Sequence, residues 1–98
     1  MDIVFLEPAE SELDEAISYY NGERAGLGDE YLVEVLRALE RIASFPRSGH
    51  PFSRNTRRCL INRFPYAVIY QVSENSILVI AIAHLHREPG YWVHRLGR

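Results

Sequence analysis

The chain has 98 residues, of which 47% are hydrophobic and 24% are charged, and these values are typical of one small folded domain, residues 1–98. The longest apolar run, Ile77–Ala83, is much shorter than the ~20 residues that a transmembrane helix needs. The first residues, "MDIVFLEPAE", lack the basic start and long apolar stretch of a secretory signal, and the single Cys59 has no internal disulfide partner. These features predict a cytoplasmic protein.

The net charge of −2 conceals an uneven distribution of charge along the chain. Residues 1–40 carry eleven acidic residues and two Arg, whereas residues 41–98 carry nine Arg and two acidic residues. This asymmetry is consistent with an acidic partner for the basic half, either nucleic acid or an acidic protein segment. The alternative is that the acidic residues lie on solvated helix faces and are balanced by Arg within the fold. The chain has no Lys, so every basic side chain is a planar guanidinium suited to carboxylate or phosphate.

The first half of the chain predicts a strand followed by two helices. "DIVFL" (Asp2–Leu6) is a β-branched and aromatic run that ends at a Glu-Pro pair. From Pro8 to Tyr20, apolar residues recur at helical spacing, with Pro8 in the first turn. After the Gly-rich residues 21–28, Asp29 is expected to cap a second amphipathic helix that ends near Phe45.

The second half predicts a loop and a meander of three strands. Residues 46–56 are rich in Pro, Gly and Ser and fit neither helical nor strand periodicity, which predicts a long loop. Strand-like runs follow at Arg57–Phe64, Tyr66–Val72 and Ser76–Leu85, and their short connections require antiparallel pairing. Ile77–Ala83 does not alternate, which predicts an inner strand covered on both faces. The predicted fold is α+β, with a two-helix hairpin packed on an antiparallel sheet in the order β-α-α-β-β-β.

The stretch "AHLHREPGYWVHR" (Ala83–Arg95) concentrates the residue types that carry chemistry. It contains the single Trp, three of the four His and two Arg. His84 and His86 leave the same face of a strand, which is at best half of a zinc site, and neither Cys59 nor His94 adds a ligand pair. We therefore predict no metal and no cofactor.

Acid–base cleavage of RNA is a reaction that this stretch could support. The reaction needs a base for the 2′-hydroxyl, an acid for the leaving oxygen and cations for the charged phosphorane. The candidate catalytic residues are His86, Arg87 and Tyr91. The alternative, which the residue types alone favour, is that Tyr91 and Trp92 form a hydrophobic lid over the core.

Several stretches of the chain resemble the RelE/ParE superfamily of bacterial type II toxins. They are "LDEAISYY", "GLGDEYLVEVLRALERIASFP", "RRCLINRFPYAVIYQV" and "ILVIAIAHLHREPGYWVHR", and the most specific part is "RFPYAVIYQV" followed by "AIAHLHREPGYW". The resemblance extends over nearly the whole chain. It implies a strand–helix–helix–meander fold and a partner antitoxin whose chain wraps around the toxin and neutralises it.

The resemblance implies two different activities. RelE-like members cleave mRNA in the ribosomal A site, whereas ParE-like members inhibit DNA gyrase. When the sequences are aligned on "YAVIYQV", the two catalytic Arg of the RelE type fall at Ala67 and at or next to His86, and the catalytic Tyr falls near Trp92. Because Ala67 cannot stabilise the charge of a phosphorane, the sequence favours a ParE-like toxin that binds DNA gyrase. The alternatives are a RelE-like ribosome-dependent endoribonuclease, and a relic that binds only its antitoxin.

The predicted target- or partner-binding surface combines the polar part of Ala83–Arg95 with Arg residues of the preceding strands. Its members are Arg57, Arg58, Arg63, His84, His86, Arg87, Tyr91, Trp92, His94 and Arg95. The basic half of the chain is expected to bind an acidic, partly amphipathic antitoxin segment that folds on contact. An open cleft lined by His86, Arg87 and Tyr91 would favour the nuclease, and a buried Trp92 would favour the lid.

Overall fold

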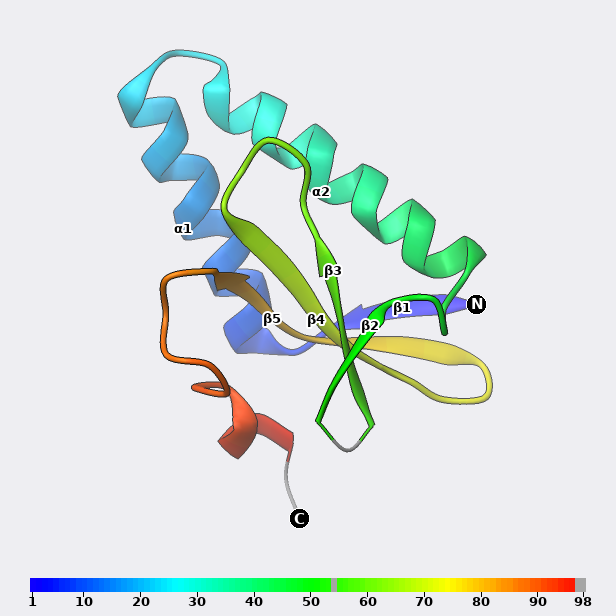
Figure 1. Ribbon diagram of the computed structural model, residues 1–98. Coiled ribbons are helices and arrows are strands. Elements are labelled where there is room, and N and C mark those ends of the chain that lie inside the picture. The colour runs from blue at the N-terminus through cyan, green and yellow to red at the C-terminus, as the bar shows by residue number, and fades with distance from the viewer. Residues whose placement is uncertain (54, 97–98) are drawn as a thin grey trace.

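A computed structural model describes residues 1–53 and 55–96 and has two helices packed on a five-stranded sheet. In chain order the elements are β1 (Asp2–Phe5), α1 (Glu7–Glu23), α2 (Leu27–Ser44), β2 (His50–Ser53), β3 (Thr56–Leu60), β4 (Tyr66–Val72), β5 (Ser76–His84) and the short 3₁₀-helix η1 (Val93–Leu96). Figure 1 shows the two helices as a hairpin, with the orange-to-red C-terminal segment in the lower part of the view. The predicted α+β architecture is confirmed.

The sheet is mixed, with the strand order β1-β5-β4-β3-β2. β1 pairs with β5 in parallel, from Asp2 opposite Ser76 to Phe5 opposite Val79, whereas the other neighbours are antiparallel. Short connections require antiparallel pairing for β3, β4 and β5. They do not constrain the direction of β1, because the whole helical hairpin lies between β1 and the later strands in the sequence. The predicted antiparallel sheet therefore has one parallel strand at its edge.

The prediction of an irregular loop over residues 46–56 was wrong in part, because β2 lies within it. β2 pairs with β3, with an irregular register between Pro51 and Ser53. Pro and Gly obscure strand periodicity. An edge strand nevertheless tolerates Pro, because the backbone along its outer edge forms no hydrogen bonds to another strand. β2 is the edge strand next to β3.

The predicted strand Arg57–Phe64 ends earlier, at Leu60. The N–H of Ile61 donates to the carbonyl oxygen of Tyr66 at 2.9 Å, and Arg63 has a left-handed φ of 75°. Arg63 therefore lies in the turn between β3 and β4. The prediction from the sequence, which placed Arg63 on the sheet, was wrong. This turn needs a left-handed residue, which a strand cannot contain.

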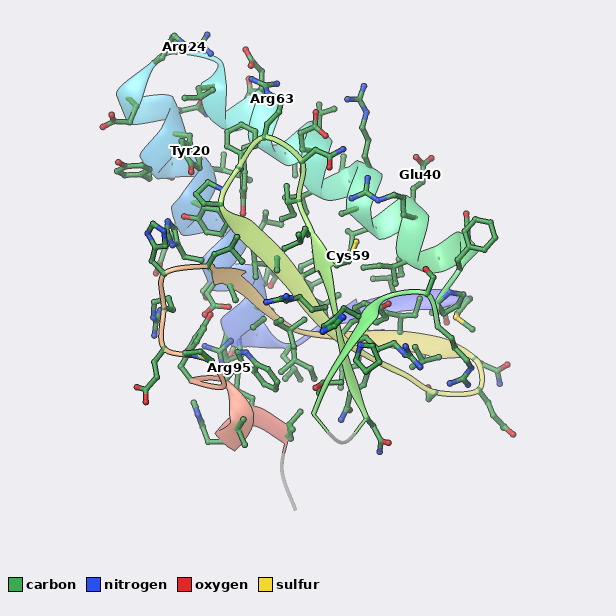
Figure 2. All side chains as sticks on the ribbon, in the orientation of Figure 1. Tyr20, Arg24, Glu40, Cys59, Arg63 and Arg95 are labelled. Atoms are coloured by element: carbon green, nitrogen blue, oxygen red, sulfur yellow. The ribbon has the colours of Figure 1, made fainter. Side chains whose placement is uncertain are left out.

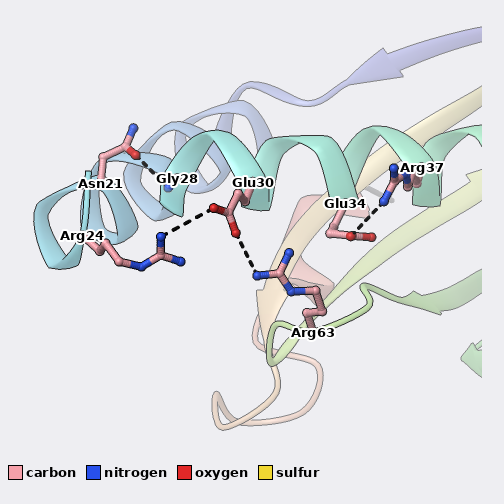
Figure 3. A network of polar contacts seen from close by, with 7 residues as sticks. All are labelled: Asn21, Arg24, Gly28, Glu30, Glu34, Arg37 and Arg63. Atoms are coloured by element: carbon pink, nitrogen blue, oxygen red, sulfur yellow. Dashed lines mark hydrogen bonds and ion pairs between the residues drawn. The ribbon is translucent and has the colours of Figure 1, made fainter. Parts of the chain in front are cut away.

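The connection between the helices is shorter than predicted, because α1 continues to Glu23 and α2 begins at Leu27. Gly26, with a φ of 88°, occupies the N-cap position of α2, so the prediction that Asp29 caps this helix was wrong. The side-chain oxygen of Asn21 accepts a hydrogen bond from the N–H of Gly28 at 2.7 Å (Figure 3). This bond satisfies one of the free N–H groups in the first turn of α2.

The two helices approach each other closely at Gly28. A Cβ atom there would overlap the carbonyl oxygen of Ile17 and the side chain of Asn21, whereas a Cβ at Gly22 of α1 would meet open space. We expect Gly28→Ala to destabilise the fold by about 1–3 kcal/mol. Gly22→Ala should instead stabilise it by about 0.5–1 kcal/mol, because Ala is the better helix former. Urea denaturation of both variants measures the two changes in the free energy of unfolding. Changes of the same sign and size in the two variants would contradict the prediction.

Apolar side chains cover both faces of the sheet centre. On one face, the helices contribute a stripe of fully buried residues from α2, namely Tyr31, Val35, Ala38 and Ile42. On the other face, the C-terminal segment (residues 85–96) contributes Trp92, which packs against β4 and β5. Most of β5 is therefore buried from both sides, as its lack of alternation predicted. Neither helix has the length and hydropathy that crossing a membrane would require, for the residues that the structure describes.

Candidate functional site

A partly buried carboxylate on α1 holds the C-terminal segment in place. Glu12 accepts a hydrogen bond of 2.6 Å from the hydroxyl of Tyr91 and a bidentate pair of 2.9 and 3.0 Å from the guanidinium of Arg95. The Glu12 and Arg95 side chains are only 16% and 12% exposed. Glu12, Tyr91 and Arg95, which we call the Glu12 cluster, therefore join residues far apart in the sequence.

The Glu12 cluster also closes an open edge of the sheet. β1 pairs with β5 only as far as Val79, so within residues 1–53 and 55–96 no strand lies beside the edge of β5 beyond this residue. There Glu12 accepts from the N–H of Ile82 at 3.0 Å, and Arg95 donates to the carbonyl oxygen of Ile80 at 3.1 Å. Side chains thus satisfy backbone groups that would otherwise be exposed at an unpaired edge.

The cluster fixes the protonation of its members. Burial acts to raise the pKa of Glu12, but the hydrogen bonds from Arg95, Tyr91 and Ile82 outweigh it and hold the pKa below its usual 4.5. Burial, together with the bond to Glu12, raises the pKa of Tyr91. At neutral pH Glu12 is therefore ionised and Tyr91 protonated, and the hydroxyl of Tyr91 is committed as a donor.

Trp92 belongs to the core and not to the surface. It is 2% exposed and packs in one cluster with Ile69, Ile80 and the small residues Ala67, Ala81 and Ala83. This burial is what the hydrophobic-lid interpretation expects of Trp92.

The turn after β5 presents the remaining polar residues of the stretch. The rings of His84 and His86 lie 4.9 Å apart, and the N–H of His86 donates to Nδ1 of His84 at 3.0 Å. The pKa of His84 is lowered, chiefly by partial burial and to a smaller extent by the nearby His86. The guanidinium of Arg87 stacks 3.9 Å from the centre of the Tyr91 ring. His86 and Arg87 are exposed, while His84 is half-buried.

Two small pockets flank the stacked pair of Arg87 and Tyr91. The first, of about 90 Å³, lies on the outer face of the sheet and is lined by residues that include Arg58, Ala67, Ile69, Ala83 and Trp92. The second, of about 160 Å³, lies between α1 and the end of β5, and its lining includes Glu12, Glu15, Tyr19, Tyr66 and His84. His86 is part of neither lining, so the pockets do not combine the three candidate catalytic residues.

Three other predicted binding residues lie elsewhere. Arg57 points to the helix side of the sheet and donates to the carbonyl oxygen of Gly49 at 2.8 Å. Arg63 forms an ion pair of 2.9 Å with Glu30 of α2. His94 is exposed on η1. Figure 2 shows Arg63 and Arg95 at opposite ends of the molecule, so the predicted residues do not form one continuous surface.

The charge asymmetry of the sequence is partly neutralised within the fold. Glu12 pairs with Arg95, and Glu30 pairs with Arg63 and, at 3.6 Å, with Arg24 (Figure 3). The alternative interpretation of the asymmetry, that Arg balances the acidic helices, therefore applies to these residues. The pairs of Glu30 are exposed, and such pairs contribute little to stability.

The described residues contain no group of three His, Cys, Asp or Glu side chains placed to hold a metal ion. Cys59 is a free thiol that packs partly buried against the core, with its Sγ 3.8 Å from the guanidinium of Arg41.

Comparisons with known proteins identify the family. Residues 3–89 match the family described as "ParE toxin of type II toxin-antitoxin system, parDE". The chain belongs to the ParE toxin family. A solved structure described as "Chromosomal ParDE TA system from P. aeruginosa" has the same fold, with a TM-score of 0.76 over 88% of this chain and 97% of that chain, at 13% sequence identity. No curated protein matches the sequence.

The match to the ParE family ends at Pro89, before the residues of the C-terminal segment that bind Glu12. Within this ParE-family chain, Ala67 lies at the centre of the sheet between Leu60 of β3 and Ala83 of β5 and is fully buried. The position to which the resemblance assigned a RelE-type Arg is therefore a small core residue in this chain.

Glu12 was not among the site residues predicted from the sequence, and one of the two interpretations placed the acidic helix residues on solvated faces. A signal was present, because Glu12 follows Ala9 by three residues and precedes Ala16 by four, and both alanines are buried. An acid within the apolar stripe of a helix needs a partner in the core. The helical spacing could therefore have identified the residue, although not its partners.

Proposed function

We propose that this chain is the toxin of a type II toxin–antitoxin pair that arrests growth by binding DNA gyrase, and that a cognate antitoxin neutralises it. Membership of the ParE family supports the toxin class. The observation that carries the choice of binding over cleavage is the Glu12 cluster. It commits Tyr91 and Arg95, a proton-transfer candidate and a cation, to contacts that hold the fold together.

The surface that suits a protein target is the turn after β5. Leu85 is 44% exposed there, next to the exposed His86 and Arg87, so the turn combines an apolar side chain with cationic and hydrogen-bonding groups. Arg is enriched and aromatic or aliphatic anchors are frequent in protein interfaces. Because gyrase works in the cytoplasm, this target would place the toxin there.

Pulse-labelling after induction without antitoxin tests the proposal. We expect incorporation of a DNA precursor to fall first, while incorporation of an amino acid continues over the same interval. Purified toxin should inhibit DNA supercoiling by gyrase in a concentration-dependent way. If translation collapses first, the gyrase proposal is wrong; if neither process changes, the chain is a relic that binds only its antitoxin.

The second candidate function is a ribosome-dependent, metal-independent endoribonuclease. It is favoured by one observation, the closeness of His84 and His86 to a stacked Arg87 at the end of β5. In this case purified toxin should cleave mRNA on programmed ribosomes. His86→Ala and Arg87→Ala should then reduce cleavage by at least about 100-fold, the contribution of a general acid or base. The gyrase proposal expects no cleavage by the wild type.

A further inference from the structure

The outer face of the sheet has a hollow that results from its small residues. Two cross-strand rows lie on this face, Leu60–Ala67–Ala83 and Arg58–Ile69–Ala81. Three of these side chains are alanines, which leave the surface low between Arg58 on β3 and Trp92 of the C-terminal segment. The resulting pocket has a volume of about 90 Å³, and more of its lining is apolar than polar.

Two guanidinium groups at this pocket have no carboxylate partner among the residues that the structure describes. Arg58 is half-buried, and its Nε is fully buried without a hydrogen-bond partner among the described residues. Arg87 stacks on Tyr91 and forms none of the ion pairs found within residues 1–53 and 55–96. Glu88 also lines the pocket, so the lining carries two positive charges and one negative charge beside the half-buried His84. A buried donor without an acceptor is costly, and an anion in the pocket would place a negative charge beside both guanidinium groups.

The pocket fits a carboxylate side chain better than a nucleotide. A nucleic acid is recognised by stacking of its bases on exposed aromatic rings, but Trp92 is 2% exposed and the face of Tyr91 is covered by Arg87. A carboxylate on one or two methylene groups matches both the apolar floor and the guanidinium forks.

We propose that the pocket between Arg58 and Arg87 receives one Glu or Asp side chain of the antitoxin. The methylene groups would lie on Ala67, Ile69 and Ala83, and the carboxylate would accept from the two guanidinium groups. This inference rests on the proposed function, because it names the place where the neutralising partner is anchored. It also narrows the predicted basic surface to Arg58 and Arg87, the two Arg that line this pocket.

Binding of the antitoxin encoded beside this toxin, measured by calorimetry on the full-length proteins, tests the pocket. Arg58→Gln and Arg87→Gln are each expected to raise the Kd at least about tenfold, because each removes one side of a partly buried charge pair. Arg63→Gln is the matched control: it removes the same charge from an exposed pair with Glu30 and should change the Kd less than about twofold. Arg58→Lys should raise the Kd less than Arg58→Gln does but still above that of the wild type, because Lys keeps the positive charge without the planar guanidinium. Thermal melts of every variant report whether it remains folded.

Replacing the acidic residues of the antitoxin one at a time by their amides should identify a single residue whose effect disappears in Arg58→Gln. Equal losses in the Arg58, Arg87 and Arg63 variants would overturn the pocket and leave only long-range attraction. An oligouridylate that binds the wild type but not Arg58→Gln would also overturn it, in favour of an RNA ligand. Failure of the wild type to bind any antitoxin would instead refute the proposed function. Tight binding that is indifferent to Arg58 and Arg87 refutes the pocket alone.

Discussion

Glu12→Gln is expected to destabilise the fold by about 2–4 kcal/mol and to lower the Tm by about 10–20 °C. The amide keeps the size of the side chain but leaves the guanidinium of Arg95 as an uncompensated charge that is only 12% exposed. It also weakens the bonds to the Tyr91 hydroxyl and the Ile82 N–H. Urea denaturation followed by circular dichroism measures the loss. The emission of the single Trp92 reports whether the C-terminal segment detaches before the rest unfolds.

The matched control for this variant is Glu15→Gln, which changes an exposed Glu one turn further along α1. It should change stability by less than about 0.5 kcal/mol. Replacing both members of the buried pair, as Glu12→Gln with Arg95→Met, should cost less than the sum of the two single variants, because no charge is then left unpaired. Additive losses in this double variant would contradict the ion-pair argument.

The stabilising effect of Glu12 should depend on pH in a defined direction. Because its pKa in the folded state is held below the usual 4.5, the ionised carboxylate stabilises the fold above about pH 4.5. This contribution is lost as the pH falls through the lowered folded-state pKa. The difference in stability between wild type and Glu12→Gln should therefore be constant from pH 5 to 7 and shrink below about pH 4.5. A difference that grows on acidification would show that Glu12 acts in another way.

The parts of the fold that depend on local periodicity were predictable from the sequence. The apolar stripes of α1 and α2, the bounds of β4 and the two-sided burial of β5 follow from residue spacing within single elements. β2 was missed because Gly49 and Pro51 interrupt its pattern, and an edge strand is too weakly constrained to show one. The parallel pairing of β1 was missed because the helical hairpin between β1 and the sheet leaves its direction open.

The candidate site was predictable only as a set of residue types. The sequence placed Tyr91, Trp92 and Arg95 on one functional edge, but Tyr91 and Arg95 are held by Glu12, which lies 79 and 83 residues away in the chain. Likewise, nothing local distinguishes Arg58 from Arg57, and only the alternation of side chains across the sheet places them on opposite faces. Spacing along one element can show that an acid must be buried; it cannot show which distant cation it meets.

Trp92→Ala is expected to be the most destabilising single change outside the helical core, at about 3–5 kcal/mol. The side chain is 2% exposed and rests on alanines of β4 and β5, which are too small to move into the space it would leave. The C-terminal segment depends on this contact and on the Glu12 cluster, so its loss should uncover one face of the sheet. Chemical denaturation followed by far-UV circular dichroism measures the change, with a lowering of the Tm by about 15 °C or more.

Val93→Ala is the control for this variant, because the neighbouring Val93 is 49% exposed and its truncation should cost less than about 0.5 kcal/mol. The loss of stability in Trp92→Phe should lie between the losses in Val93→Ala and Trp92→Ala, since Phe keeps part of the apolar contact with the sheet. Trp92 also lines the pocket between Arg58 and Arg87, so its removal is expected to weaken antitoxin binding as well as stability. The measure of the lid interpretation is therefore stability alone: Trp92→Ala as stable as the wild type would contradict it.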